Sequence, residues 1–297
     1  MITKLTPALK TIKQAIMNSK SEIKLIATDL DGTLLDYQMN LSDENKMAME
    51  QAAQKGVMLV VATGRSFLSV PDYVKDINGI KYAVTANGAK THDVLTGQLI
   101  DGKYIGEDAI DAVWDILNKA NIMLEVFVEG RPYVHNWDYV NPHIFGTTET
   151  YIKYFLKTRK PVEDIFSFIR KNKNSIENIN LVFRSPDDRW STLSELENIQ
   201  KITENFAITS SFPFNLEIGG YMVDKAGAIE NLCNMNGINS NNVMCIGDNI
   251  NDIGMIEFAG IGVAMGDAAP EVIEAADYVT KKSSESGVAF AIRKFVL

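Results

Sequence analysis

The sequence predicts an α/β protein in which a doubly wound, Rossmann-like parallel sheet is interrupted by an inserted α+β domain. Short apolar runs that end in polar or glycine residues alternate with helical segments up to about residue 89, and the same alternation returns from Lys225. Such alternation of strands and helices is typical of a parallel sheet. The chain has 297 residues, enough for one large or two ordinary domains.

The first core strand is predicted within residues 22–36, EIKLIATDLDGTLLD. Its apolar part suits a strand buried on both faces, and Asp29 and Asp31 follow at its carboxyl end. Ser42 is expected to cap the next helix, which Gly56 ends. A strand, a helix and a strand are then predicted at residues 57–62, 67–77 and 81–85.

Residues 90–218 show a different sequence pattern, which predicts strand pairs and helices without glycine-rich strand ends. Hairpins are predicted at residues 92–100 and at 122–128 with 132–135. Helices are predicted at residues 108–120, 161–171 and 187–203. A strand at 178–183 and a pair at 206–210 and 214–218 complete the insertion, and residues 136–160 are expected to be irregular. This α+β segment has the size of a domain.

The strand–helix alternation then resumes to the end of the chain. Helices are predicted at residues 225–236, 251–258, 270–276 and 287–295, and strands at 243–246, 261–264 and 278–280. The predicted core domain therefore comprises residues 23–89 and 219–297, and the inserted domain comprises residues 90–218. Residues 1–22 precede both and are predicted to form a basic amphipathic helix, packed on the body or on a second subunit.

The composition favours a cytoplasmic protein that binds small molecules. The net charge of −9 argues against nucleic acid or an anionic membrane surface as the main partner. No apolar run approaches the length needed to cross a bilayer. Cys233 and Cys245 lie in apolar contexts and are interpreted as reduced core residues. A monomer or a homodimer fits these observations.

Polar residues mark several predicted strand or helix ends: Asp29 with Asp31, then Thr63, Lys225 and Asp248. The carboxyl ends of parallel strands meet at one edge of a sheet, so these side chains are expected to converge. Three carboxylates make a plausible oxygen cage for Mg²⁺. A hydroxyl and an ammonium opposite that cage would hold phosphate oxygens, which is the arrangement that phosphoryl transfer requires.

At this point the residues resemble the haloacid dehalogenase (HAD) superfamily. Asp29-Leu30-Asp31-Gly32-Thr33, Thr63, Lys225 and the run from Gly247 to Asp252 are similar to its four motifs. The insertion resembles the large cap of the Cof-like phosphatase branch. The resemblance covers nearly everything from Ile23 onward. One departure is Ala226, which stands where the family usually has Gly.

The resemblance implies an Mg²⁺-dependent phosphatase that hydrolyses small phosphate esters, sugar phosphates first, through an aspartyl-phosphate. Asp29 would be the nucleophile and a metal ligand, and Asp31 the general acid/base, which also offers its backbone carbonyl to the metal. The remaining roles it implies are phosphate binding by Thr63, Lys225 and Asn251, metal binding by Asp248, support from Gly64 and Asp252, and substrate contacts from Arg65 and Asn87. The cap would close over the site and select the leaving group.

Each residue taken singly has a simpler reading. Thr63 could cap a helix, Lys225 could be a solvated helix start, and Asp252 could pair with a lysine. A phosphomutase on the same core is an alternative, and it would need a second basic cluster in the cap, for which Arg159 is one candidate. A non-catalytic metabolite-binding or regulatory protein is the other alternative, although ligand binding alone does not require both Asp29 and Asp31.

Overall fold

The computed structural model describes residues 22–119, 121–145 and 148–297. The helix predicted at the start of the chain lies outside the described residues, apart from Glu22. The chain divides into two compact units. The first contains residues 22–61, Ile77–Ile80 and Ile229–Leu297, and the second contains Ala62–Asp76 and Lys81–Ala228.

The first unit is built on parallel strands in the order β14-β13-β12-β1-β2. Their bounds are β1 Leu25–Thr28, β2 Met58–Ala62, β12 Val243–Gly247, β13 Ile261–Ala264 and β14 Tyr278–Val279. Strand β1, LIAT, is buried along its whole length, as its apolar run predicted. Strand β1 lies between β12 and β2 in the sheet. Because β1 and β12 run parallel, the residues that follow them lie at neighbouring strand ends.

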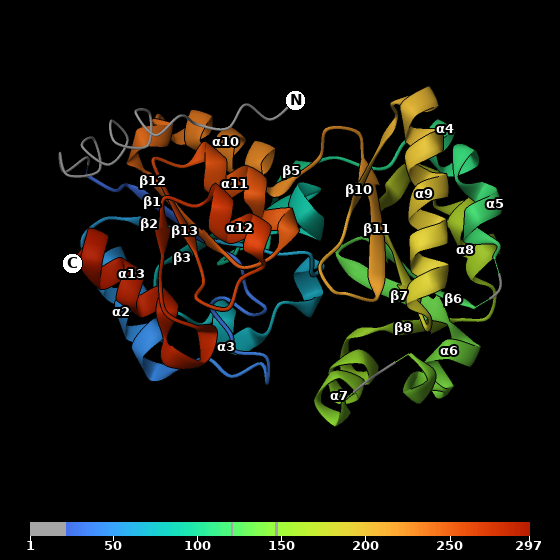
Figure 1. Ribbon diagram of the computed structural model, residues 1–297, viewed down its shortest axis with the longest axis horizontal. Coiled ribbons are helices and arrows are strands. Elements are labelled where there is room, and N and C mark those ends of the chain that lie inside the picture. Colours follow the sequence, from blue (N-terminus) through green and yellow to red (C-terminus); the bar gives the residue numbers. More distant parts are fainter. Residues whose placement is uncertain (1–21, 120, 146–147) are drawn as a thin grey trace. The chain divides into compact units, whose positions relative to one another are not determined.

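Helices accompany these strands as the sequence predicted. They are α2 Asp43–Gln54, α10 Lys225–Asn236, α11 Ile253–Phe258, α12 Pro270–Ala275 and α13 Gly287–Phe295, with short 3₁₀ turns η5 Ser240–Asn242, η6 Ile250–Asp252 and η7 Ser283–Glu285. Helix α10 begins in the second unit and continues in the first. The Ser42 side chain caps α2 by accepting from the Asn45 N–H at 3.1 Å. Helices α2 and α13 lie side by side (Figure 1).

The second unit contains a mixed sheet in the order β10-β11-β9-β6-β7-β8, in which only β7 and β8 are parallel. The strands are β6 Ile122–Val128, β7 Arg131–His135, β8 Lys160–Val162, β9 Ile176–Phe183, β10 Phe206–Thr209 and β11 Asn215–Gly220. Strand β3 Ile80–Thr85 pairs antiparallel with β4 Lys90–Asp93, and β4 pairs antiparallel with β5 Leu99–Gly102. The hairpin predicted at residues 92–100 therefore pairs with β3 and not with the mixed sheet.

Helices α4, α5, α8 and α9 cover one face of the mixed sheet (Figure 1). The helices of this unit are α3 Asp72–Lys75, α4 Glu107–Ala112, α5 Trp114–Leu117, α6 Asn136–Val140, α7 Glu149–Thr158, α8 Ile165–Lys171 and α9 Pro186–Thr203, with 3₁₀ turns η1 Phe67–Ser69, η2 Ala86–Gly88, η3 Pro142–Ile144 and η4 Lys173–Ser175. An apolar core fills the space between that face and its helices, and it includes Ile179, Leu181 and Leu196. The predicted α/β class, with a parallel core sheet and a separate sheet domain, is confirmed.

Four predictions of local structure were wrong. The helix predicted at residues 67–77 is split into η1 and α3, because Pro71 holds the residue before it in an extended conformation. The helix predicted from residue 108 is split at Val113 into α4 and α5. The helix predicted from residue 161 starts only after Asp164, whose side chain caps α8. Residues 136–160, predicted as irregular, contain α6 and α7.

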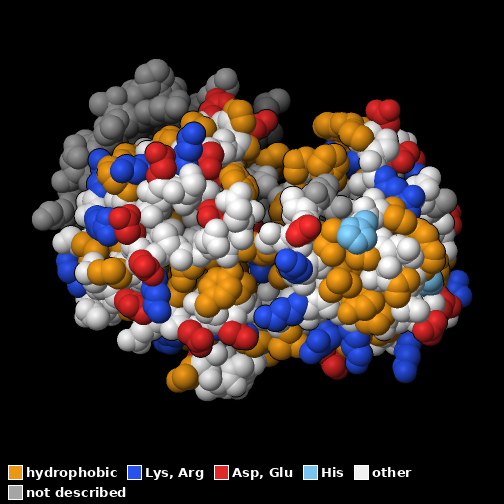
Figure 2. Space-filling view, turned by 90° about the horizontal axis from the view of Figure 1, so that it is seen from below, with side chains coloured by type: hydrophobic (Ala, Val, Ile, Leu, Met, Phe, Trp, Pro, Cys, Tyr) orange, Lys and Arg blue, Asp and Glu red, His pale blue; other side chains and the backbone are white. Residues whose placement is uncertain are grey.

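The surface carries both signs of charge. On the left half of the face drawn in Figure 2, acidic and basic side chains are interspersed, so most exposed charges there have opposite charges nearby. Among the described residues, no helix combines the length and the apolar character that a bilayer crossing requires. Cys233 and Cys245 are both buried free thiols, as the sequence predicted.

Candidate active site

The turn after β1 fixes the two aspartates of the first motif in different surroundings. The Asp29 N–H donates to the Ile246 carbonyl of β12 at 2.9 Å, so Asp29 continues the parallel pairing. The chain then turns back, and the Leu35 N–H donates to the Leu30 carbonyl at 2.8 Å. Asp29 is 7% exposed, whereas Asp31 lies half-buried on the turn. The Asp29 carboxylate is therefore buried at the end of β1, and the Asp31 carboxylate lies on the more exposed turn that follows.

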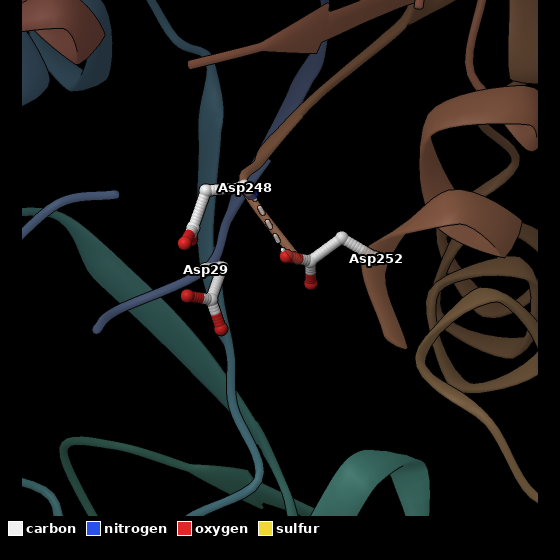
Figure 3. A group of neighbouring side chains, drawn as sticks. All are labelled: Asp29, Asp248 and Asp252. Carbon is white, nitrogen blue, oxygen red and sulfur yellow. Dashed lines mark hydrogen bonds between the residues drawn. The ribbon is translucent and has the colours of Figure 1, made fainter. Parts of the chain in front are cut away.

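Three carboxylates converge in the first unit: those of Asp29, Asp248 and Asp252 (Figure 3). Each offers an oxygen within 4.8 Å of the others, and all three side chains are buried. Like charges at this spacing repel one another, and burial increases that cost. A hard divalent cation with oxygen ligands would relieve the repulsion, so the donor set fits Mg²⁺.

The sequence predicted a different third carboxylate. The expected cage was Asp29, Asp31 and Asp248, but the carboxylate found with Asp29 and Asp248 is that of Asp252. One Asp252 oxygen accepts from the backbone N–H groups of Asp248 and Asn249, each at 3.0 Å. The bond from the Asn249 N–H is part of a capping box at the start of η6, and both bonds hold the Asp252 side chain near the end of β12.

Asp248 is held from two sides. The Thr33 hydroxyl donates to its Oδ1 at 2.6 Å, across 215 residues of sequence. A Cβ added at Gly32 would lie 2.5 Å from its Oδ2, closer than atoms approach in real structures. Gly32 also has a φ of +85°, which side chains rarely adopt. Glycine is therefore required here for two separate reasons: the backbone conformation, and the close approach of the Asp248 carboxylate.

Sequence reasoning missed Tyr37 as a neighbour of this site. Tyr37 is 63% exposed, but its partial burial, and then the negative charges of Asp248 and Asp267, raise the pKa of its phenol to about 12. A Cβ at Gly32 would also lie 3.0 Å from the Tyr37 ring. The phenol thus stays protonated near the carboxylates and can donate a hydrogen bond. In the sequence, only the position of Tyr37 six residues after Asp31 indicated that it could lie near the site.

The remaining predicted residues, apart from Asn251, lie in the second unit, where Thr63 and Asn87 are in direct contact. Thr63 is 1% exposed; its Oγ1 accepts from the Arg65 N–H at 3.1 Å, and its carbonyl accepts from the Asn87 N–H at 3.1 Å. A Cβ added at Gly64 would lie 3.1 Å from the Asn87 side chain. The Thr63-Gly64-Arg65 loop is therefore packed against the turn that follows β3.

Lys225 begins α10 next to the same turn. A Cβ added at Gly88 would lie 2.0 Å from the Asp224 carbonyl oxygen and 3.1 Å from the Lys225 nitrogen, so the two backbones touch. Asp224 Oδ1 accepts from the Gly227 N–H at 2.7 Å and satisfies the first turn of the helix. Lys225 is 1% exposed. The structure thus gathers Thr63 and Lys225 into one neighbourhood of the second unit.

Arg65 and Asn87 make specific contacts inside the second unit. The Arg65 guanidinium lies 4.3 Å from the centre of the Tyr154 ring and donates to the Ser69 carbonyl at 3.2 Å. The Asn87 side chain donates to Glu217 at 2.6 Å. Asn251, in contrast, lies half-buried in η6 of the first unit, between the ends of the capping box.

Comparisons with known proteins find relatives that align with nearly the whole chain. A family profile for haloacid dehalogenase-like hydrolases matches residues 26–292. The chain is 33% identical over 283 residues to the 5-amino-6-(5-phospho-D-ribitylamino)uracil phosphatase YcsE of Bacillus subtilis, covering 95% of this chain and all of the relative. A solved haloacid dehalogenase-like hydrolase from B. subtilis superposes with a TM-score of 0.80 at 26% identity, covering 92% of this chain and all of that one.

A third comparison concerns the fold alone. The solved structure of the HAD subclass IIB sugar phosphatase BT4131 superposes with a TM-score of 0.74 at 23% identity, covering 92% of this chain and 98% of that chain. Its subclass matches the parallel core sheet and the separate mixed sheet described above.

Proposed function

The chain belongs to the haloacid dehalogenase-like hydrolases and is a phosphatase of small phosphorylated metabolites, and from this premise we propose an Mg²⁺-dependent phosphomonoesterase that forms an aspartyl-phosphate on Asp29. The observation that carries the proposal is the buried group of Asp29, Asp248 and Asp252 at neighbouring strand ends. When bound there, Mg²⁺ would neutralise phosphate charge and orient the phosphoryl group for in-line attack.

Asp29 is the proposed nucleophile. Its carboxylate oxygen attacks phosphorus, and the bond from phosphorus to the ester oxygen breaks. Asp31, two residues on and more exposed, gives a proton to the departing alkoxide oxygen. The Asp31 carboxylate then takes a proton from water, which attacks phosphorus and releases inorganic phosphate from Asp29. Asp31 ends the cycle protonated, ready for the next substrate.

The other motif residues have proposed supporting roles. Thr63, Lys225 and Asn251 bind phosphate oxygens, and Gly64 leaves room beside Thr63. Asp252 holds the end of β12 through two backbone N–H groups and thereby positions Asp248. The Asp31 carbonyl joins Asp29 and Asp248 as a metal ligand. Ala226 lies in the first turn of α10, where one added methyl leaves the helix intact.

A polyhydroxylated alcohol is the proposed leaving group. The relative YcsE is named for a phosphoribitylamino-uracil, and BT4131 is named a sugar phosphatase. Both names describe phosphate esters of hydroxylated carbon chains. We propose that residues 90–218 act as the cap and select this alcohol, with sugar phosphates and ribityl phosphates as the first compounds to screen.

Trapping with beryllium fluoride, a mimic of the phosphoryl group, tests the two aspartate roles. Asp29→Asn should abolish both turnover and trapping. Asp31→Asn should lose proton transfer, a fall of about 10²–10⁴-fold in kcat, and still trap the mimic. Activity on an aryl phosphate should vanish in excess EDTA and return with Mg²⁺. Full hydrolysis in EDTA, or the reverse trapping pattern, would overturn the mechanism.

The alternatives make different predictions for the same assay. A phosphomutase needs a cationic site for a second phosphate, but Arg159, one of its candidates, is only 7% exposed and pairs with Glu125. A metabolite-binding protein would bind phosphate esters yet release no phosphate from any of them. Release of inorganic phosphate from several esters would exclude that second alternative.

A further inference from the structure

The turn η2, between β3 and β4 in the second unit, has an unfavourable backbone conformation. Ala86, Asn87 and Gly88 all have positive φ, at 49°, 54° and 100°. A side chain makes this left-handed region unfavourable, most clearly at Ala86, because asparagine tolerates it better than alanine does. Such a conformation persists only where the surrounding structure holds it, and it is frequent at functional sites. The contacts of η2 therefore indicate what this turn is held for.

The turn contacts both segments of the second unit to which we assign phosphate binding. The Asn87 N–H donates to the Thr63 carbonyl at 3.1 Å. On its other side, Gly88 packs against the start of α10, since a Cβ added there would lie 3.1 Å from the Lys225 backbone nitrogen. The position of η2 therefore affects the positions of both Thr63 and Lys225.

Glu217, on β11, holds this turn through its side chain. Its Oε2 accepts from the Asn87 Nδ2 at 2.6 Å, and its Oε1 accepts from the Asn215 Nδ2 at 3.1 Å and from the Ser211 hydroxyl. The residue is only 3% exposed. Burial raises the pKa of Glu217, and these three donors and the charge of Lys225 oppose that rise. Hydrogen bonds to a buried carboxylate are strong, so Asn87 is firmly anchored to β11.

Two of the donors to Glu217 also pack against the loop that contains Thr63. A Cβ added at Gly64 would lie 3.1 Å from the Asn87 Oδ1 and 3.2 Å from the Ser211 Oγ. Glu217 therefore fixes two side chains that line one side of this loop. All of these residues belong to the second unit.

We propose that Glu217 is a positioning residue for the phosphate group and acts through Asn87 on the turn η2. The turn then fixes Thr63 and Lys225, which bind the phosphate oxygens. A carboxylate repels phosphate, so Glu217 contributes only through its neighbours. This inference rests on the proposed function, which assigns phosphate binding to Thr63 and Lys225.

Inhibition by inorganic phosphate, measured with Mg²⁺ present, tests the proposal. Glu217→Ala should raise the inhibition constant of phosphate by about 10-fold, because the loss of a hydrogen bond to a carboxylate releases the turn. The KM values for D-ribitol 5-phosphate and for acetyl phosphate, which has no hydroxyl groups, should rise by the same factor. The kcat values should change less, since phosphate is bound in the ground state as well as in the transition state. Glu217→Gln keeps an oxygen for Asn87 and should retain nearly normal constants.

Asn87→Gly breaks the same link from its other end. Glycine adopts positive φ without strain, so this variant removes the side chain and preserves the backbone of the turn. It should also raise the inhibition constant of phosphate, and it serves if Glu217→Ala folds poorly. In the double variant no further rise is expected, because both substitutions remove one interaction.

Glu125→Gln is the matched control. Glu125 is a buried carboxylate in the same row of the mixed sheet as Glu217, but it pairs with Arg159. Its replacement should leave the inhibition constant of phosphate unchanged. Equal rises in Glu125→Gln and Glu217→Ala would overturn the inference and point to a general loosening of the second unit.

Two other results would also overturn the inference. One is an unchanged inhibition constant in both Glu217→Ala and Asn87→Gly. The other is a rise in KM for D-ribitol 5-phosphate alone, which would make Glu217 a residue that recognises the alcohol. Failure of the unmodified protein to hydrolyse either compound would instead contradict the proposed function.

Discussion

Each unit buries a group of carboxylates, and the two groups are stabilised in different ways. In the second unit, Glu125 has its counter-charge within the fold, because Arg159 donates to both of its oxygens. Burial alone would lower the pKa of Arg159, but the charge of Glu125, its hydrogen bond to Arg159 and the nearby Tyr154 and Tyr151 together outweigh this effect, and the pKa stands well above its usual range. In the first unit, Asp29, Asp248 and Asp252 each offer an oxygen within 4.8 Å of the others, so three carboxylates converge.

This difference separates structural charge from functional charge. A carboxylate paired by a guanidinium and amides has no capacity left for an external cation. Three carboxylates that converge keep oxygen atoms directed at a common point, which an external cation can occupy. Burial by itself therefore identifies neither kind of site. The convergence of several carboxylate oxygens on one point distinguishes the first group.

The largest effect on stability is expected in the second unit. Glu125→Gln should lower the free energy of unfolding by about 3–5 kcal/mol, because Arg159 then stays buried without its counter-charge. Equilibrium unfolding in urea measures this. The double variant Glu125→Leu with Arg159→Met should recover most of the loss, since apolar groups can replace a buried pair. A single variant as stable as the unmodified protein would show that the pair is not structural.

The next effect concerns the geometry of the first site. Gly32→Ala should reduce kcat/KM by about 10²-fold, because its methyl group displaces Asp248 from its position. Gly56→Ala is a matched control: Gly56 has nearly the same φ, +86°, but an added Cβ there meets nothing within 4 Å. Equal activity losses in both variants would attribute the effect to backbone strain and not to Asp248.

Divalent cations should stabilise the folded protein by binding to the Asp29, Asp248 and Asp252 group and not to the Glu125 pair. At a concentration of Mg²⁺ one hundred times its Kd, the free energy of unfolding should rise by about 2.7 kcal/mol. Asp252→Asn should weaken binding by about 10–100-fold through the positioning of Asp248, which reduces the gain to about 0.4–1.4 kcal/mol. Glu125→Gln should keep the full gain above its own lower baseline. A gain that survives Asp252→Asn unchanged would remove Asp252 from the site.

Local sequence predicted the strands that carry the first site and the cap of α2. Apolar runs located β1 and β12, and their terminal aspartates located the site, because burial on both faces requires a continuous run. The cap at Ser42 also follows from local chemistry. These features depend on neighbours within a few residues, which a single sequence displays directly.

The features that were missed depend on distant partners. Arg159 was predicted in an exposed basic cluster, but Glu125, 34 residues away, makes it a buried residue. Asp252 was predicted as a supporting residue and not as the third carboxylate of the group, which it joins through hydrogen bonds from the N–H groups of Asp248 and Asn249. Residues 136–160 are rich in aromatic residues and were predicted as irregular, but they contain the short helix α6 and the helix α7, which is capped by Thr148 and buries Phe155. Spacing along the chain carries no information on such contacts.

The buried His92 differs from both carboxylate groups because its imidazole is neutral in the folded state. His92 in the second unit stacks on Phe67 with ring centres 4.1 Å apart, and its Nδ1 has no partner. Burial, and then repulsion from Lys90, lower the pKa of His92 from 6.5 to about 4. The folded state thus holds the imidazole neutral, while the unfolded chain binds a proton at higher pH.

His92 therefore predicts the smallest effect, an acid sensitivity in a defined window. Its contribution to stability is complete above pH 6.5 and is lost as pH falls toward about 4, since the unfolded state binds more protons there. The difference in pKa corresponds to about 3 kcal/mol, and solvent screening should reduce this to about 1–2 kcal/mol.

His92→Phe keeps the stacking and removes the titration, so it should lose less stability than the unmodified protein between pH 7 and pH 4. Urea unfolding at several pH values measures the difference. Identical pH profiles for His92→Phe and the unmodified protein would mean that the imidazole accepts its proton inside the fold.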